Sequence, residues 1–124
     1  MSDLSASPTT HPPNDPTWSR SERAIARKVF DAALKRELQD VVQKAKQKAS
    51  QIKEPADVWE LEQYLTQRRK EIDRKYQFRS SRLTQVLGML LCEGRIADDE
   101  LRGLRDDKVK AIRSLAKVLS EDAA

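Results

Sequence analysis

No glycine or proline interrupts residues 18–54, and this constrains the fold more than any other feature of the sequence. Within this stretch apolar residues recur at steps of three and four, which is the spacing of one face of an α-helix. Ser19 and Glu22 form an S-x-x-E capping box just before the periodic region. The pattern predicts a single helix over residues 19–52, roughly 50 Å long.

A second long helix is expected to follow. Pro55 ends the first helix, and its missing amide suits the first turn of another. A new apolar stripe begins at Val58 and meets no breaker before Gly88, while Gly94 is a good residue for a helix C-terminus. We therefore predict a helix over residues 56–92 that runs antiparallel to the first.

Two shorter helices are expected near the C-terminus. Asp98 is placed to cap a short helix that carries Leu101 and Leu104, and Asp106 and Asp107 suit the first turn of a last helix. The predicted fold class is therefore all-α, a long antiparallel hairpin with two short C-terminal helices. Each long helix covers only part of its partner's apolar stripe, so we expect a second copy to cover the rest in a homodimer.

Composition agrees with one helical domain. Charged residues make up 35% of the chain and aromatic residues 5%, which argues against a β sandwich or barrel. Residues 1–17 hold four of the five prolines and predict a disordered tail, followed by a helical domain over residues 18–120. No apolar run approaches the roughly 20 residues of a membrane helix, and no signal peptide is evident, so a cytoplasmic location is expected.

The sequence offers no set of residues for catalysis, for a metal ion or for a cofactor. Cys92 is the single cysteine and His11 the single histidine, and no phosphate-binding, zinc-protease or serine-hydrolase motif occurs. The Asp-Asp pairs at 98–99 and 106–107 are explained by helix N-terminal capping. We therefore expect a protein that is not an enzyme and that binds no cofactor.

Seven basic residues fall between Arg68 and Arg82, and the net charge of the chain is +4. Nucleic-acid binding would explain such a run, because basic side chains neutralise phosphates. On a helical wheel, however, these charges scatter around the axis, and Glu71 and Asp73 have basic neighbours for pairing, such as Lys75. Nucleic-acid binding is therefore the less favoured alternative.

Trp59 occupies an unusual place on the second predicted helix. It lies about 120° from the centre of the apolar stripe, among polar neighbours, while Arg69 lies at the edge of the stripe. A large aromatic side chain on a polar face is typical of an anchor for a protein partner. The alternative is that Trp59 packs on another helix or inside the dimer.

Several short segments, taken in order and at consistent spacing over roughly residues 18–119, form a recognisable set. They are Trp18-Ser19, Arg36-Glu37-Leu38, Asp57 to Leu65, Arg69 to Tyr76, Arg79, Glu93-Gly94, Glu100-Leu101 and Asp107-Lys108. Together they resemble the fluorescence recovery protein family of cyanobacteria. The resemblance implies an all-helical homodimer that uses no cofactor and no covalent chemistry.

The resemblance also implies a partner. Members of this family bind the open red form of the orange carotenoid protein, a two-domain photoreceptor that quenches the phycobilisome antenna, and speed its return to the closed orange form. We therefore expect the partner to be an orange carotenoid protein or a related carotenoid-binding domain. Binding that lowers a conformational barrier needs no catalytic side chain.

The resemblance assigns a partner-binding set to this chain. Its members are Trp59, Glu62, Gln63, Arg69, Gln85 and Ala111. Four of them depart from the family pattern: Glu62 stands at a histidine position, Gln63 at an acidic one, Gln85 at an aromatic one and Ala111 at a basic one. These departures leave open a second function, an adaptor for an unrelated protein in a host without the photoreceptor.

The dimer interface is expected on the same helix. The resemblance places Val58 and Arg69 there, and the neighbouring apolar stripe adds Leu61, Leu65 and Ile72.

Overall fold

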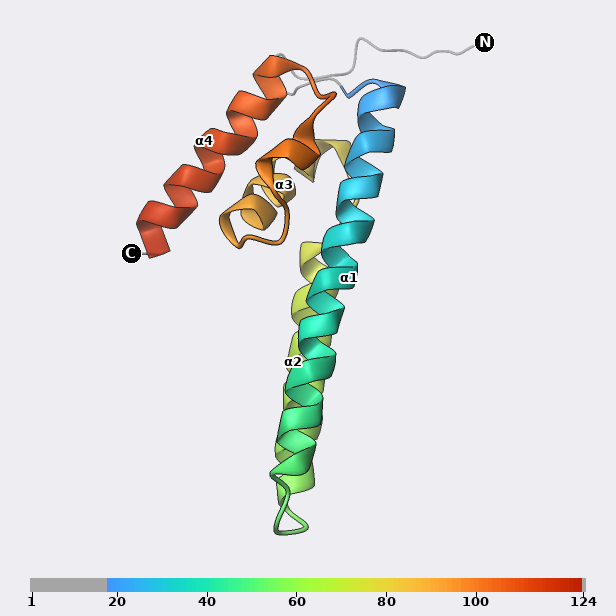
Figure 1. Cartoon of the computed structure of the whole chain (residues 1–124), viewed down its shortest axis with the longest axis vertical. Helices are drawn as coiled ribbons and strands as arrows, with labels where there is room; N and C mark the ends of the chain where they lie inside the picture. Colours follow the sequence, from blue (N-terminus) through green and yellow to red (C-terminus); the bar gives the residue numbers. More distant parts are fainter. Residues whose placement is uncertain (1–17, 124) are drawn as a thin grey trace.

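The computed structural model describes residues 18–123, and all regular structure in that range is helical (Figure 1). The elements are α1 (Arg20–Ser50), α2 (Asp57–Lys75), α3 (Leu83–Cys92) and α4 (Asp106–Ala123), with the short 3-10 helices η2 (Ser80–Arg82) and η3 (Asp98–Leu101). The predicted all-α fold class is therefore confirmed. The predicted tail, residues 1–17, lies outside the described residues.

The start of α1 agrees with the sequence. The Glu22 amide donates to the Ser19 hydroxyl at 3.2 Å, and the Ser19 amide donates to the Glu22 carboxylate at 3.1 Å, so the predicted capping box is present. The helix continues for 31 residues and ends at Ser50, close to the predicted end. Its length follows from the absence of breakers.

α1 and α2 form an antiparallel hairpin, with their connecting loop at one end of the molecule (Figure 1). The Lys48 ammonium lies 5.4 Å from the Tyr64 ring near the loop, and Arg68 hydrogen-bonds Glu37 further along. We refer to η2, α3, η3 and α4, at the opposite end, as the head. The predicted hairpin is thus confirmed for the first nineteen residues of its second arm.

The predicted continuous helix over residues 56–92 is wrong, because α2 ends at Lys75 and α3 begins at Leu83. In the intervening segment Tyr76 and Phe78 place their rings edge-on against Phe30, with centroids 5.9 and 5.3 Å away. No local breaker causes this interruption. Aromatic packing on α1, formed only in the tertiary structure, outweighs the helical preference of the segment.

The break turns α3 across the head, where it packs against α4 and α1 (Figure 1). Four α3 side chains are completely buried: Leu83, Val86, Leu87 and Leu90. They form one core with side chains of α1, η3 and α4, among them Phe30, Leu101 and Ile112. A helix with apolar residues on most of its surface needs this enclosed position.

The segment after α3 differs in detail from the prediction. Gly94 has φ of 75°, as expected for a helix C-terminus. The residue before η3 is Ala97, whose amide donates to Glu100 at 2.8 Å, so Asp98 is not the cap. Asp98 instead pairs with Arg113 at 2.5 Å, and Leu104 lies beyond the short helix.

The last helix begins as expected, with Asp106 and Asp107 in its first turn. None of the helices over residues 18–123 combines the length and apolarity that crossing a bilayer requires.

Candidate partner-binding surface

Trp59 lies in the first turns of α2, and 65% of its surface is exposed. Its neighbours Glu62 and Gln63 are exposed as well, and the Thr66 hydroxyl donates to Glu62 at 2.9 Å. The helix turns Trp59 to the side away from α1, as its wheel position predicts. The alternative in which Trp59 packs on another helix of its own chain is therefore wrong.

Arg69 lies on the same helix, roughly 15 Å further along its axis. Its side chain is exposed and makes no ion pair or hydrogen bond with the side chains of residues 18–123. A free guanidinium group and an exposed indole on one helix are the groups that protein interfaces use most often as anchors.

Gln85 and Ala111 do not lie beside Trp59. Both are exposed, Gln85 on α3 and Ala111 on α4, so they belong to the head rather than to the hairpin. The predicted partner-binding set therefore divides between two parts of the fold.

The hairpin exposes an apolar flank, which we define as Leu34, Leu38 and Val42 of α1 with Val58 and Leu65 of α2. The α1 residues line one shallow groove, in which Leu38 is 45% and Val42 is 49% exposed. On α2, Val58 is 46% and Leu65 is 41% exposed. On each helix these apolar residues follow the helical repeat, and both sets lie on the same side of the α1–α2 contact. They therefore form a continuous face.

The remaining predicted dimer residues have different environments. Leu61 is half-buried and Ile72 is only 9% exposed, so both pack mainly within their own chain. Arg69 borders the apolar flank on α2, one turn beyond Leu65.

Glu37 is a buried carboxylate where the hairpin meets the head, and it is 2% exposed. It accepts hydrogen bonds from Arg68 at 2.7 Å, Lys75 at 2.8 Å and the Tyr76 hydroxyl at 2.8 Å. Burial raises the pKa of Glu37, but these donors outweigh burial and bring the pKa to about 2. The same contact and burial raise the pKa of Tyr76.

A second buried ion pair joins the starts of α1 and α4. Glu22 is 3% and Lys108 is 1% exposed, and their charged groups lie 2.8 Å apart. Glu22 also accepts from the Arg105 amide at 3.0 Å, and the Lys108 ammonium lies 5.2 Å from the Trp18 ring. Burial raises the pKa of Glu22, whereas the hydrogen bonds lower it more, to about 2.

Sequence reasoning gave Glu22 only its role in the capping box and assigned no role to Glu37. Glu37, Lys108 and Trp18 nevertheless lie in the short segments that carry the family resemblance. Arg36, from the same segment as Glu37, pairs with Glu100, from a further segment, at 2.9 Å between α1 and η3. The segments that carry the family resemblance therefore include residues whose contacts hold the head on α1.

The basic run does not present seven charges on one surface. Arg68 and Lys75 point inward to Glu37, and the expected pair between Glu71 and Lys75 is not formed. Glu71 pairs with Arg68 at 2.6 Å instead, because Glu37 and Glu93 both engage Lys75. Because Arg68 and Lys75 are engaged in these pairs, two of the seven basic residues are not available to bind nucleic-acid phosphates.

The described part of the chain contains no group of three or more His, Cys, Asp or Glu side chains arranged to hold a metal ion. Cys92 is half-buried at the end of α3.

Comparison with known proteins identifies relatives for nearly the whole described region. The family model described as photoprotection regulator fluorescence recovery protein matches residues 18–116. The fluorescence recovery protein of Synechocystis sp. PCC 6803 is 38% identical over 101 residues, which span 82% of this chain and 93% of that protein.

Solved structures agree with the sequence match. The fluorescence recovery protein of Fremyella diplosiphon is similar with a TM-score of 0.76 at 38% identity, covering 82% of this chain and 99% of that chain. The structure of the Synechocystis sp. PCC 6803 protein gives a TM-score of 0.77 with the same identity and coverage.

Proposed function

Because this chain belongs to the fluorescence recovery protein family, whose members are photoprotection regulators, we propose that it acts on an orange-carotenoid-protein-type partner in the cytoplasm. It binds the open red form of that partner and accelerates the return to the closed form, which ends antenna quenching. The protein acts by binding alone and is not an enzyme.

The observation that carries this proposal is the exposure of Trp59. An indole that is 65% exposed leaves a large apolar surface in water, which partner binding would remove. Arg69 on the same helix supplies a charged group that is free to bind a partner carboxylate or backbone carbonyl. Trp59 and Arg69 are therefore the proposed anchors.

The four positions that depart from the family pattern have weaker roles in this proposal. Glu62 and Gln63 extend the contact around Trp59, and Gln85 and Ala111 contribute from the head. Each loss of an aromatic or charged hot spot costs about 1–3 kcal/mol of binding, so Trp59 and Arg69 must supply most of the affinity.

We also propose a homodimer that buries the apolar flank. A two-fold axis brings the same surface of each copy together, so Val58 and Leu65 of one copy meet an equally apolar surface on the other. The wide apolar stripe that α1 and α2 share supports this assembly, because one hairpin leaves several of its side chains about half exposed. The dimer would be a four-helix arrangement.

The proposed mechanism is differential binding. A regulator that binds the transition between the open and closed forms more tightly than the open form itself lowers the barrier between them. No proton transfer or covalent step is required. Trp59 and Arg69 suit this role because one α-helix carries both, which sets their relative positions before the partner binds.

The decisive experiment is the dark recovery rate of a photoactivated orange carotenoid protein with and without this chain. We expect clear acceleration by the wild-type protein and at least a tenfold loss of partner affinity for Trp59→Ala, which corresponds to about 1.4 kcal/mol. Gln43→Ala is the control, because Gln43 is exposed on α1 and belongs neither to the proposed partner-binding set nor to the apolar flank.

An adaptor function is the second candidate, favoured by the substitutions at Glu62, Gln63, Gln85 and Ala111. It predicts a folded dimer that neither binds the photoreceptor nor accelerates its recovery, but captures another host protein in a Trp59-dependent manner. A nucleic-acid binder would instead show affinity that falls steeply with salt and is unaffected by Trp59→Ala.

A further inference from the structure

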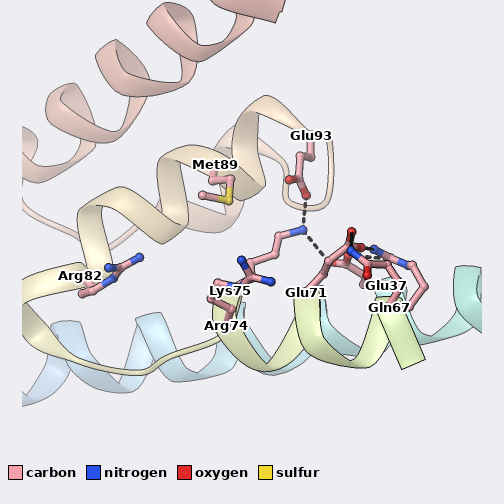
Figure 2. A pocket seen from close by; sticks show the side chains of 9 residues that line it. Glu37, Gln67, Glu71, Arg74, Lys75, Arg82, Met89 and Glu93 are labelled. Carbon is pink, nitrogen blue, oxygen red and sulfur yellow. Dashed lines mark hydrogen bonds and ion pairs between the residues drawn. The ribbon is translucent and has the colours of Figure 1, made fainter. Parts of the chain in front are cut away.

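A pocket of about 450 Å³ opens between the C-terminal part of α2 and α3 (Figure 2). Its volume lies in the range of small-ligand sites. The wall carries four basic side chains, three carboxylates and the thioether of Met89. It lies outside both the apolar flank and the Trp59 surface.

The three carboxylates of this pocket already have cationic partners. Glu37 accepts from Arg68 and Lys75, as described above. Glu71 pairs with Arg68 at 2.6 Å, and Glu93 pairs with Lys75 at 2.5 Å. Figure 2 shows Lys75 reaching up to Glu93 in this way. These contacts use two of the four basic side chains and all three acids.

Arg74 and Arg82 remain. Within residues 18–123 neither forms an ion pair, and the Nε–H of Arg82 is buried with no hydrogen-bond partner. Figure 2 shows both side chains on the side of the pocket below Met89. Two like charges on one wall, neither of them in an ion pair, are unfavourable until a group of opposite charge lies between them.

We propose that this pocket binds a small multivalent oxyanion, of the phosphate or polycarboxylate class, between Arg74 and Arg82. Guanidinium groups bind such anions through pairs of parallel hydrogen bonds, and two of them match an anion with more than one negative charge. The terminal N–H groups of both side chains would supply these donors, because the Nε–H of Arg82 is buried. Met89 adds an apolar side chain to the wall of the pocket.

The position of the two arginines gives the anion a structural effect. Arg74 belongs to the last turn of α2, and Arg82 is the residue immediately before α3. An anion held by both would link the hairpin to the head across residues 76–81. It would therefore stabilise the break between the two helices, whichever protein partner the chain has.

The test is thermal unfolding of the full chain at fixed protein concentration, titrated with pyrophosphate or with citrate. Sodium chloride at equal ionic strength controls for general screening. We expect a saturable rise in Tm, of roughly 5 °C at a tenfold excess over Kd. The anion that saturates at the lower concentration identifies the class, phosphate or polycarboxylate.

The residues are tested in parallel. In wild-type protein the NMR signal of the Arg82 Nε–H should shift on titration with the better anion. Arg74→Gln combined with Arg82→Gln should abolish the saturable rise in Tm, whereas Arg79→Gln, exposed in the same segment and outside the pocket wall, should retain it. A rise no larger than that in chloride, an unmoved Arg82 signal, or equal loss in Arg79→Gln would overturn the proposal.

Discussion

Glu37 shows how much one side chain can determine in a small helical protein. Its neighbours on α1 are partly exposed to solvent, yet Glu37 itself is only 2% exposed. Its carboxylate accepts three hydrogen bonds, two from α2 and one from the segment that follows α2. A buried carboxylate is tolerated only when its lone pairs are satisfied, so its partners have to be in place together. The Glu37 carboxylate therefore holds the two helices of the hairpin and the segment after α2 together.

Glu37→Gln is expected to destabilise the protein by about 3–5 kcal/mol, because Arg68 and Lys75 would keep their charges in a mostly buried site without the carboxylate. Urea unfolding followed by circular dichroism measures the change. Glu71→Gln is the matched control, since it removes another acid from Arg68 but at a side chain that is 44% exposed. We expect a loss below about 1 kcal/mol for the control. Equal losses in the two variants would contradict the role of Glu37.

The stability of the fold is expected to depend on pH through the buried carboxylates of Glu22 and Glu37. The pKa values of Glu22 and Glu37 are both near 2, below the usual 4.5, so each carboxylate stabilises the fold above pH 4.5 and loses this effect as the pH falls toward 2. Tm should fall between about pH 5 and pH 2. In Glu37→Gln the fall should be shallower, because one of the two groups no longer titrates. A slope identical to that of wild type would count against the low pKa of Glu37.

At the scale of elements, the break after Lys75 is the feature that shapes the head. Apolar spacing continues through the break, and no glycine or proline marks it. The rings of Tyr76 and Phe78 nevertheless leave the helix to pack on Phe30. The break lets α3 bury four aliphatic side chains instead of extending them along the hairpin.

The close contact between α3 and α4 depends on Gly88. A Cβ at this position would lie 2.9 Å from Leu115 Cδ2 and 3.0 Å from Leu115 Cβ. Gly88→Val is therefore expected to destabilise the protein by about 1–3 kcal/mol, because the added atoms force the two helices apart. Chemical unfolding measures the loss.

Leu115→Ala provides the test of that explanation, since it removes the atoms that the new side chain meets. The double variant should lose less stability than the sum of the losses in the two single variants, by at least about 0.5 kcal/mol. Strict additivity would show that Gly88 is needed for a reason other than the contact with Leu115.

At the scale of the whole molecule, the hairpin is an arm that the head supports at one end (Figure 1). It carries groups of different chemistry: the apolar flank for the proposed second copy, and Trp59 with Arg69 for the proposed partner, Arg69 also bordering the flank. Their position on a single pair of helices means that dimer formation and partner binding would be coupled through α2.

Val58→Glu is expected to give monomers, because the new charge would be buried without a partner in the proposed dimer interface. Light scattering after size-exclusion chromatography measures the mass. Val118→Glu is the control, as it adds the same charge at a similarly exposed valine on α4. A Val58→Glu protein that remained dimeric would place the interface elsewhere on the molecule.

The sequence by itself determined the helical fold class, the capped start of α1 and the turn at Pro55. These features are set by neighbours three or four residues apart, and such spacing can be read along one chain. The resemblance of its segments added the family, which the comparisons confirm.

Only the tertiary structure decided where the second helix ends, which acids are buried, and that Gln85 and Ala111 lie apart from Trp59. Glu37 meets Arg68 and Lys75 from 31 and 38 residues away, and Glu22 meets Lys108 from 86 residues away. The physical reason is that helical periodicity predicts which side of a helix is apolar, but not which other helix packs on that side. The burial and charge pairing that fix the head arise only when those distant segments meet.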